Sequence, residues 1–188
     1  MQAPKPFRPS LRTRLHLLLL AVVATTSLLS ACHHTVKPAR QTLGMFPVVD
    51  GARARRITHA DSVPENYRIM HEPNGAPVVI TTTPIIEGRD VSHAAATIDN
   101  YSGEPTLAIT LTSEGAEKMR AYTVAHVGDR IATVWLRPTP GADNHQRVLI
   151  QAFTIQSVFG KHFMTSGLDS IGTARKLADA LNKQAQEP

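Results

Sequence analysis

The sequence predicts an α+β fold in which helices pack on one face of a mostly antiparallel sheet. From about residue 67 onward, short segments alternate apolar and polar residues, which is the pattern of half-buried strands. Two longer segments carry apolar residues at helical spacing, each behind a residue that can cap a helix. One domain over residues 63–184 accounts for these elements, a length that suits a single hydrophobic core.

The strand segments are predicted over 67–71, 77–82, 96–100, 106–111, 130–136, 147–154 and 158–165. The first two flank Asn74-Gly75, a dipeptide typical of a tight antiparallel hairpin. Before the third, Asp90 is placed to cap a short helix that begins near residue 91. The loop 138–144 separates the fifth and sixth segments, and Trp135 is interpreted as a core residue.

Two further helices are predicted from caps and spacing. The first has Ser113 as its expected N-cap and stops at Gly128, and its apolar stripe is expected to be Ala116, Met119, Thr123 and Val127. The second begins behind Ser170, with an apolar face formed by Ile171, Ala174, Leu177, Ala178 and Leu181. Such stripes indicate packing against a core rather than contact with a cofactor.

The start of the chain has the charged-then-apolar order of a secretory signal peptide, predicted over residues 1–31. Its apolar run, 15–29, is shorter than the roughly 20 residues that a membrane-spanning helix needs. The tetrapeptide Leu29-Ser30-Ala31-Cys32 resembles the lipobox of bacterial lipoproteins. The resemblance implies cleavage between Ala31 and Cys32, and stable anchoring through diacylglycerol and a further acyl chain such as palmitate. The alternative is a plain secreted protein with an incidental cysteine.

Removal of the signal peptide changes the charge of the chain. Four basic residues and no acidic residue precede Cys32, so the 20 Lys and Arg fall to 16, against 15 Asp and Glu. A net charge near +1 argues against nucleic acid as a partner. Cys32 is the one cysteine of the sequence, so a lipidated chain has no thiol left for a disulfide, a nucleophile or a metal site.

Residues 32–62 lack sustained periodicity and are predicted to form a flexible tether behind the lipidated cysteine. Thirty residues of flexible chain have a typical end-to-end distance of about 30 Å, which would hold the domain clear of lipid headgroups. Alternatively, the basic cluster Arg53, Arg55 and Arg56 contacts anionic headgroups. Residues 185–188 are expected to be a short C-terminal tail.

No catalytic residue, metal ligand or cofactor is predicted. The histidines show neither an HExxH motif nor i, i+4 pairing, and His33 and His34 lie beside the expected lipid. The sequences around Ser102 and Ser166 lack the first glycine of a GxSxG motif, and no P-loop is present. A non-enzymatic protein is therefore expected, with an undetected hydrolase as a remote alternative.

Several local strings resemble one family. In GEPTLAITLTSEGAEKMRAYTVAHVGDRIATVWL, a strand leads into a helix with Gly115-Ala116, Met119 and Thr123, which closes at His126-Val127-Gly128 before another strand. EGRDVSHAAATIDNYSGEP adds an acidic residue before a short helix and a Gly-x-Pro turn, and ARKLADAL adds a closing helix. This pattern, over about Tyr67 to Gln184, resembles the head subdomain of the first periplasmic domain (P1) of the SecD family of protein-export membrane components.

Three features depart from that family pattern. The loop around 138–145 replaces a tight Asp-Gly hairpin, and Asp169 stands where a phenylalanine usually precedes the last helix. The chain also carries none of the helices with which SecD spans the membrane, so the resemblance does not imply the work of pulling a polypeptide.

The resemblance implies a binding module, because the SecD head is thought to engage translocating polypeptide. We expect a lipid-anchored envelope protein that faces the periplasm, is accessory to protein export, and binds translocating or unfolded polypeptide through exposed sheet edges. The alternative is a structural or assembly lipoprotein that docks to another envelope complex. His33 rather than an aspartate follows Cys32, which favours sorting to the outer membrane over the inner one.

Overall fold

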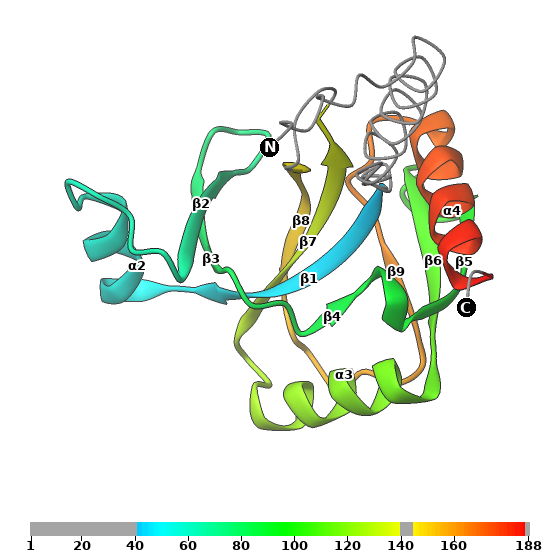
Figure 1. Ribbon diagram of the computed structural model, residues 1–188, viewed down its shortest axis with the longest axis horizontal. Coiled ribbons are helices and arrows are strands. Elements are labelled where there is room, and N and C mark those ends of the chain that lie inside the picture. The colour runs from blue at the N-terminus through cyan, green and yellow to red at the C-terminus, as the bar shows by residue number, and fades with distance from the viewer. Residues whose placement is uncertain (1–40, 140–144, 187–188) are drawn as a thin grey trace, which may run out of the picture. The chain divides into compact units, whose positions relative to one another are not determined.

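Two antiparallel sheets organise the part of the chain that the computed structural model describes, residues 41–139 and 145–186 (Figure 1). The larger sheet has the order β2-β3-β1-β7-β8, with β4 also paired to β1, and the smaller has the order β5-β6-β9. The strands are β1 (Thr42–Val49), β2 (Tyr67–His71), β3 (Pro77–Thr81), β4 (Ile86–Glu87), β5 (Val91–Ile98), β6 (Pro105–Leu111), β7 (Arg130–Pro138), β8 (His145–Thr154) and β9 (His162–Thr165). The helices are α2 (Gly51–Thr58), the 3-10 turn η2 (Gly88–Asp90), α3 (Ser113–Ala125) and α4 (Ile171–Ala185). The predicted α+β class with an antiparallel sheet is confirmed.

The hairpin predicted at Asn74-Gly75 joins β2 to β3. Gly75 has a φ of 83°, a conformation that glycine adopts without the steric penalty of a side chain. Its N–H donates to the carbonyl oxygen of Glu72 at 2.8 Å, which closes the turn. The sequence signal and the observed turn therefore agree.

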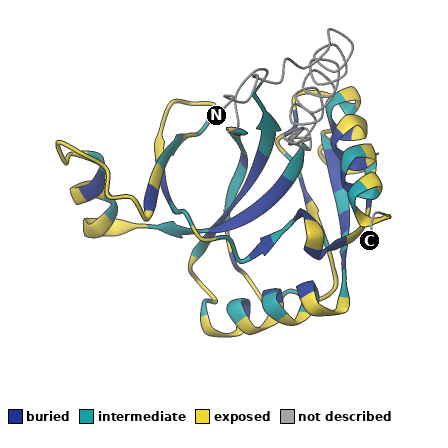
Figure 2. Cartoon of the chain, viewed as in Figure 1, coloured by how far each residue is buried: buried dark blue, intermediate teal, exposed yellow. Residues whose placement is uncertain are grey.

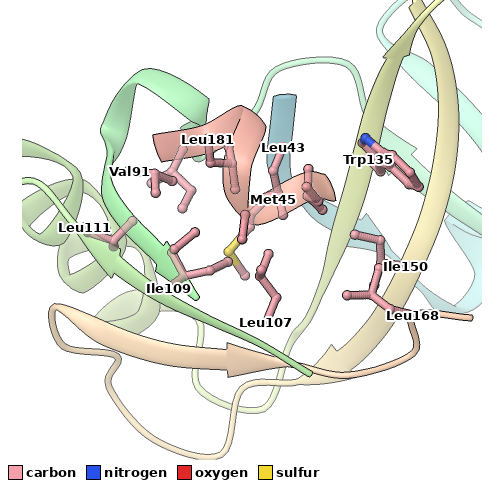
Figure 3. Close-up of a cluster of buried hydrophobic side chains, with 14 of the residues drawn as sticks. Leu43, Met45, Val91, Leu107, Ile109, Leu111, Trp135, Ile150, Leu168 and Leu181 are labelled. Carbon is pink, nitrogen blue, oxygen red and sulfur yellow. The ribbon is translucent and has the colours of Figure 1, made fainter. Parts of the chain in front are cut away.

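The central strands of the larger sheet are buried on both faces, because successive side chains of a strand point to opposite sides (Figure 2). Leu43 and Met45 of β1 lie in the principal core, whereas Phe46 lies in a second cluster with side chains of β3 and β7. Figure 3 shows side chains of β1, β6 and α4 converging in the principal core. Trp135 is 7% exposed, as expected of a core residue.

The tether predicted over 32–62 is wrong from residue 42 onward. β1 lies inside the larger sheet, where residues 42–47 pair with β7, and α2 follows it directly. The segment was missed because both faces of β1 are apolar, so it lacks the alternation that marks a half-buried strand. Its burial depends on β4 and β7, which are distant in the sequence.

The helix predicted to begin near residue 91 is also wrong. Only the single turn of η2 forms, and the alanine-rich segment behind it is the strand β5, paired with β6 from Val91 to Ile98. Alanine favours helices in isolation, but pairing with β6 and packing against α4 override that preference here. The strand segment expected over 96–100 overlaps the end of this longer strand, which stops at Ile98.

The two long helices form at or within one residue of the positions that their expected caps predicted. α3 begins one residue earlier than expected, with Thr112 as the N-cap, and its stripe residues Met119 and Thr123 are fully buried. Val127 lies beyond the helix end and is 56% exposed, so the expected stripe ends one turn sooner. α4 has the predicted cap, since the hydroxyl oxygen of Ser170 accepts the N–H of Thr173 at 3.1 Å.

Two further predictions concern connections. Pro138 pairs with His145, so β7 and β8 are longer than expected and their connection is shorter than the loop predicted from 138 to 144. Beside Asp169, which stands where the family usually has a phenylalanine, Leu168 is buried in the principal core.

None of the described helices is long and apolar enough to cross a membrane. The signal peptide, Ala31, Cys32, His33 and His34 lie outside the described residues, so their predicted roles stay predictions.

Candidate functional site

A groove of about 500 Å³ lies between β8, β9 and the connection from β5 to β6. One side comes from the end of β8 and the residues after it, including Thr154 and Gln156. The other side comes from β9 and its continuation, including Met164 and Ser166. The groove therefore lies where an outer strand of the larger sheet approaches an outer strand of the smaller one.

The main chain of β9 presents hydrogen-bonding groups toward this groove. The N–H of Leu111 donates to the carbonyl oxygen of Lys161, and the antiparallel register continues through Ile109 with Phe163. In such a ladder alternate residues bond to the neighbouring strand, so Met164 directs its N–H and C=O outward. The main chain of Met164 has no partner within the described residues, and its side chain is 54% exposed.

β8 directs its own main chain toward the groove in the same way. The N–H of Ile155 donates to the carbonyl oxygen of Asp129 at 2.9 Å, so by alternation Phe153 bonds toward β7 and Thr154 faces outward. Gln151 reaches across the groove, where its Oε1 accepts the N–H of Ser166 at 3.3 Å. This side-chain oxygen occupies the position that a carbonyl oxygen of an added strand would take.

The opposite edge of the smaller sheet is closed at Ala94 of β5. Asn182 of α4 accepts the N–H of Ala94 through Oδ1 at 2.8 Å and donates to the carbonyl oxygen of Ala94 through Nδ2 at 2.8 Å. A side-chain amide thus satisfies both outward groups of the central residue of β5. This contact leaves β9 as the edge of the smaller sheet that can accept another strand.

Stacked aromatic rings form the apolar part of the groove. The ring centroids of Phe153 and Phe159 are 5.9 Å apart, and those of Phe159 and Phe163 are 6.3 Å apart. The N–H of Phe159 donates to Oγ1 of the fully buried Thr123 at 3.1 Å, so α3 positions the segment that carries this ring. The threonine that the sequence singled out by resemblance therefore acts as a support for the groove.

Carboxylates form the polar end of the groove. Oδ1 of Asp99 accepts the main-chain N–H groups of Ser102 at 2.7 Å and Tyr101 at 2.9 Å. These bonds stabilise the charged form and lower the pKa of Asp99 below its ordinary value. Glu104 lies on the same connection, and Tyr101 at its tip is fully exposed. The groove thus joins an acidic end to an aromatic one.

A buried ion pair fixes α3 against the turn that precedes β5. Asp90 is 4% exposed, and its Oδ1 accepts Nζ of Lys118 at 2.8 Å. Hydrogen bonds to Asp90 and Glu114 raise the pKa of Lys118. A Cβ at Gly115 would lie 2.6 Å from the carbonyl oxygen of Asp90, so only glycine permits this close approach. The acidic residue and the glycine of the resembling strings are therefore structural.

The histidines are dispersed, and no group of three or more metal-ligating side chains occurs among the described residues. His126 pairs with Asp129 at 2.8 Å, and Nδ1 of His162 lies 3.1 Å from Oγ1 of Thr110. Ser102 and Ser166 line the groove, but their side chains bond to Asp99 and Gln151, and neither bonds to a histidine of the described chain that could act as a base. The sequence reasoning proposed sheet edges in general and missed this particular groove, which depends on the pairing of β9 with β6.

Comparisons with known proteins point to one family. The family described as the SecDF P1 head subdomain matches residues 64–185. The protein translocase subunit SecD of Haemophilus influenzae is 25% identical over 162 residues, covering 78% of this chain and 26% of that protein. The SecD subunit of Pseudomonas aeruginosa is 30% identical over 158 residues, covering 74% of this chain and 25% of that protein. The chain spans about a quarter of the length of these curated relatives.

Two solved structures share the fold. SecDF in its super-membrane-facing form has a TM-score of 0.52 at 23% identity, covering 76% of this chain and 19% of that one. A SecDF structure described as that of a membrane component that enhances protein export has a TM-score of 0.51 at 20% identity, covering 95% of this chain and 71% of that one.

Proposed function

The chain belongs to the family of the SecDF P1 head subdomain, and from this premise we propose that it is an export-related module that binds extended polypeptide without catalysing a reaction. The observation that carries the proposal is the open edge of β9 beside the groove. A relative of the same fold is described as a membrane component that enhances protein export. Binding of exported chains on the far side of the membrane is a role that suits a module of this family.

The chemistry of binding is main-chain pairing. An extended segment placed in the groove donates to and accepts from Met164, and its carbonyl replaces Oε1 of Gln151 at the N–H of Ser166. Hydrogen bonds to a strand edge do not read side chains, so many sequences can bind. Apolar side chains of the segment gain further free energy by covering Phe153 and Phe159.

Site-specific photocrosslinking in cells tests this proposal. A photoreactive residue at Gln156, which lines the groove, is expected to capture many different exported chains. The same residue at Arg175, which is exposed on α4 away from the groove, serves as the matched control and should capture none of them. A single stoichiometric product at Gln156 would contradict the polypeptide-binding role.

A second candidate function is docking to another envelope complex, and α3 carries the observation that favours it. Val124 in the last turn of this helix and Val127 just beyond its end are 59% and 56% exposed, and exposed apolar side chains can form a contact surface. Under this alternative, a photoreactive residue at Val127 yields one defined product while Gln156 yields none.

The proposed location is the cell envelope, with the domain held by lipid on Cys32 and facing the periplasm, at the outer membrane rather than the inner. A lipid anchor facing the periplasm would keep the groove in the compartment that exported chains enter. Cys32→Ser is expected to abolish incorporation of radioactive fatty acid and to release the protein from membranes. A mutant that stayed labelled and membrane-bound would contradict the anchor.

A further inference from the structure

Among the described residues, those that line the groove include two carboxylates and no lysine or arginine. Both carboxylates, on Asp99 and Glu104, come from the connection between β5 and β6. Thr165 pairs with Leu107, which places this connection beside the Ser166 end of the groove. Neither carboxylate forms an ion pair with another described residue. The negative charge at this end of the groove is therefore not neutralised by a neighbouring cation of the described domain.

The rest of the groove differs in chemistry. Phe153, Phe159 and the exposed Met164 offer apolar surface further along β9. Tyr101 stands fully exposed on the connection that carries the carboxylates, where its ring can cover the alkyl stem or charged group of a basic side chain. A segment lying along β9 thus meets an acidic environment at one end and an aromatic environment at the other.

We propose that the groove selects extended polypeptide segments that place a lysine or arginine beside Asp99 and Glu104 and an apolar side chain over Phe153, Phe159 and Met164. This inference rests on the proposed function and names its substrate class. Main-chain pairing alone would accept any sequence, so the discrimination comes from the side chains at the two ends. Acidic segments are disfavoured, because like charges approach each other at the turn.

Glu104 is the residue with which charge selection is best tested. Oδ1 of Asp99 holds the turn together, so replacing its carboxylate risks changing the local fold. The side chain of Glu104 forms no hydrogen bond with another described residue. Glu104→Gln therefore removes one charge and leaves the side-chain shape. Glu117→Gln is the matched control, since Glu117 is exposed on α3 outside the groove.

The experiment measures binding of three fluorescent peptides to the full chain, purified from cells in a nonionic detergent. The peptides share one extended apolar sequence and differ by Lys, Gln or Glu at the position next to the apolar residues. At low salt the lysine peptide is expected to bind about fivefold more tightly than the glutamine peptide, the magnitude of an exposed ion pair. The glutamate peptide should bind weakest, and Glu104→Gln should reduce the preference for lysine while Glu117→Gln preserves it.

Each outcome decides between the two proposals. Equal affinity for the three peptides would overturn charge selection and leave polypeptide binding intact. A preference for lysine that persists unchanged in Glu104→Gln would also overturn it, because the groove would then not be its source. Absence of binding by any peptide would overturn the proposed function and this inference with it.

Discussion

The two edges of the smaller sheet differ in how their outward main-chain groups are satisfied. On β5, Asn182 bonds to both groups of Ala94 at 2.8 Å each. On β9, Gln151 reaches only the N–H of Ser166, at 3.3 Å, and the main chain of Met164 has no partner among the described residues. Proteins usually block exposed strand edges because an open edge invites further pairing. The difference teaches that α4 satisfies outward main-chain groups of β5, whereas the edge of β9 beside the groove keeps such groups open.

Loss of the contact between Asn182 and β5 is expected to give the largest change, a decrease in the stability of the fold. Asn182→Leu removes both bonds to Ala94, which is 1% exposed, and leaves its N–H and C=O unpaired. The free energy of unfolding should fall by about 2 kcal/mol, the cost of unsatisfied buried polar groups. Chemical denaturation measures this loss, and Asp179→Leu, on the exposed face of the same helix, should change stability by less than about 0.5 kcal/mol. If the two variants were equally stable, the bonds from Asn182 to Ala94 would not stabilise the edge of β5, and the difference between the two edges would not hold.

Blocking the open edge should affect binding rather than folding. Met164→Pro removes an N–H that points away from β6, a position at which proline is tolerated on an edge strand. Affinity for an extended peptide is expected to fall about tenfold, the effect of one lost hydrogen bond at the upper end of its usual range. Met164→Ala retains the N–H and serves as the control for the lost side chain. If both variants bound the peptide equally, the main chain of β9 would not be the acceptor edge.

Removing the side chain that partly occupies the open edge should raise peptide affinity, by less than Met164→Pro lowers it. Gln151→Ala frees the N–H of Ser166, so a bound segment no longer has to displace Oε1. Peptide affinity should rise about threefold, the low end of what a hydrogen bond contributes. Gln156→Ala, which also shortens a glutamine lining the groove, is the control. Weaker binding by Gln151→Ala would show instead that this side chain contacts the ligand directly.

The smallest expected effect concerns acid stability at the turn that borders the open edge. The pKa of Asp99 is lowered from 3.8, chiefly by the N–H groups of Ser102 and Tyr101, so its charged form stabilises the folded state. That contribution is present above the unfolded pKa and is lost as the pH falls through the folded value. Asp99→Asn keeps an acceptor for the turn but cannot titrate. Between pH 5 and pH 2, the midpoint temperature of thermal unfolding should fall slightly less in this variant than in the wild type.

The sequence predicted elements wherever the decisive signal was local. Ser170 caps α4 and Asn74-Gly75 closes a hairpin, because both act on main-chain groups within a few residues. β1 was missed, and β5 was taken in part for a helix, because their conformations depend on strands far away in the sequence. The groove was missed for the same reason, since Gln151 meets Ser166 only once β8 and β9 are both in place.

By itself, the sequence determined the α+β class, the cap of α4, the turn at Asn74-Gly75, and the family to which the chain belongs, because these follow from short-range periodicity and from positions of packing residues. The lipid anchor at Cys32 is likewise a prediction of sequence alone. Only the tertiary structure decided which sheet edge is open. Two side chains decide it: Asn182 of α4, which contacts β5, and Gln151 of β8, which contacts Ser166 just after β9. They lie 88 and 15 residues from the main chain that they contact. Contacts between residues this far apart in the sequence depend on how the strands and helices pack, and a local sequence pattern does not predict that packing.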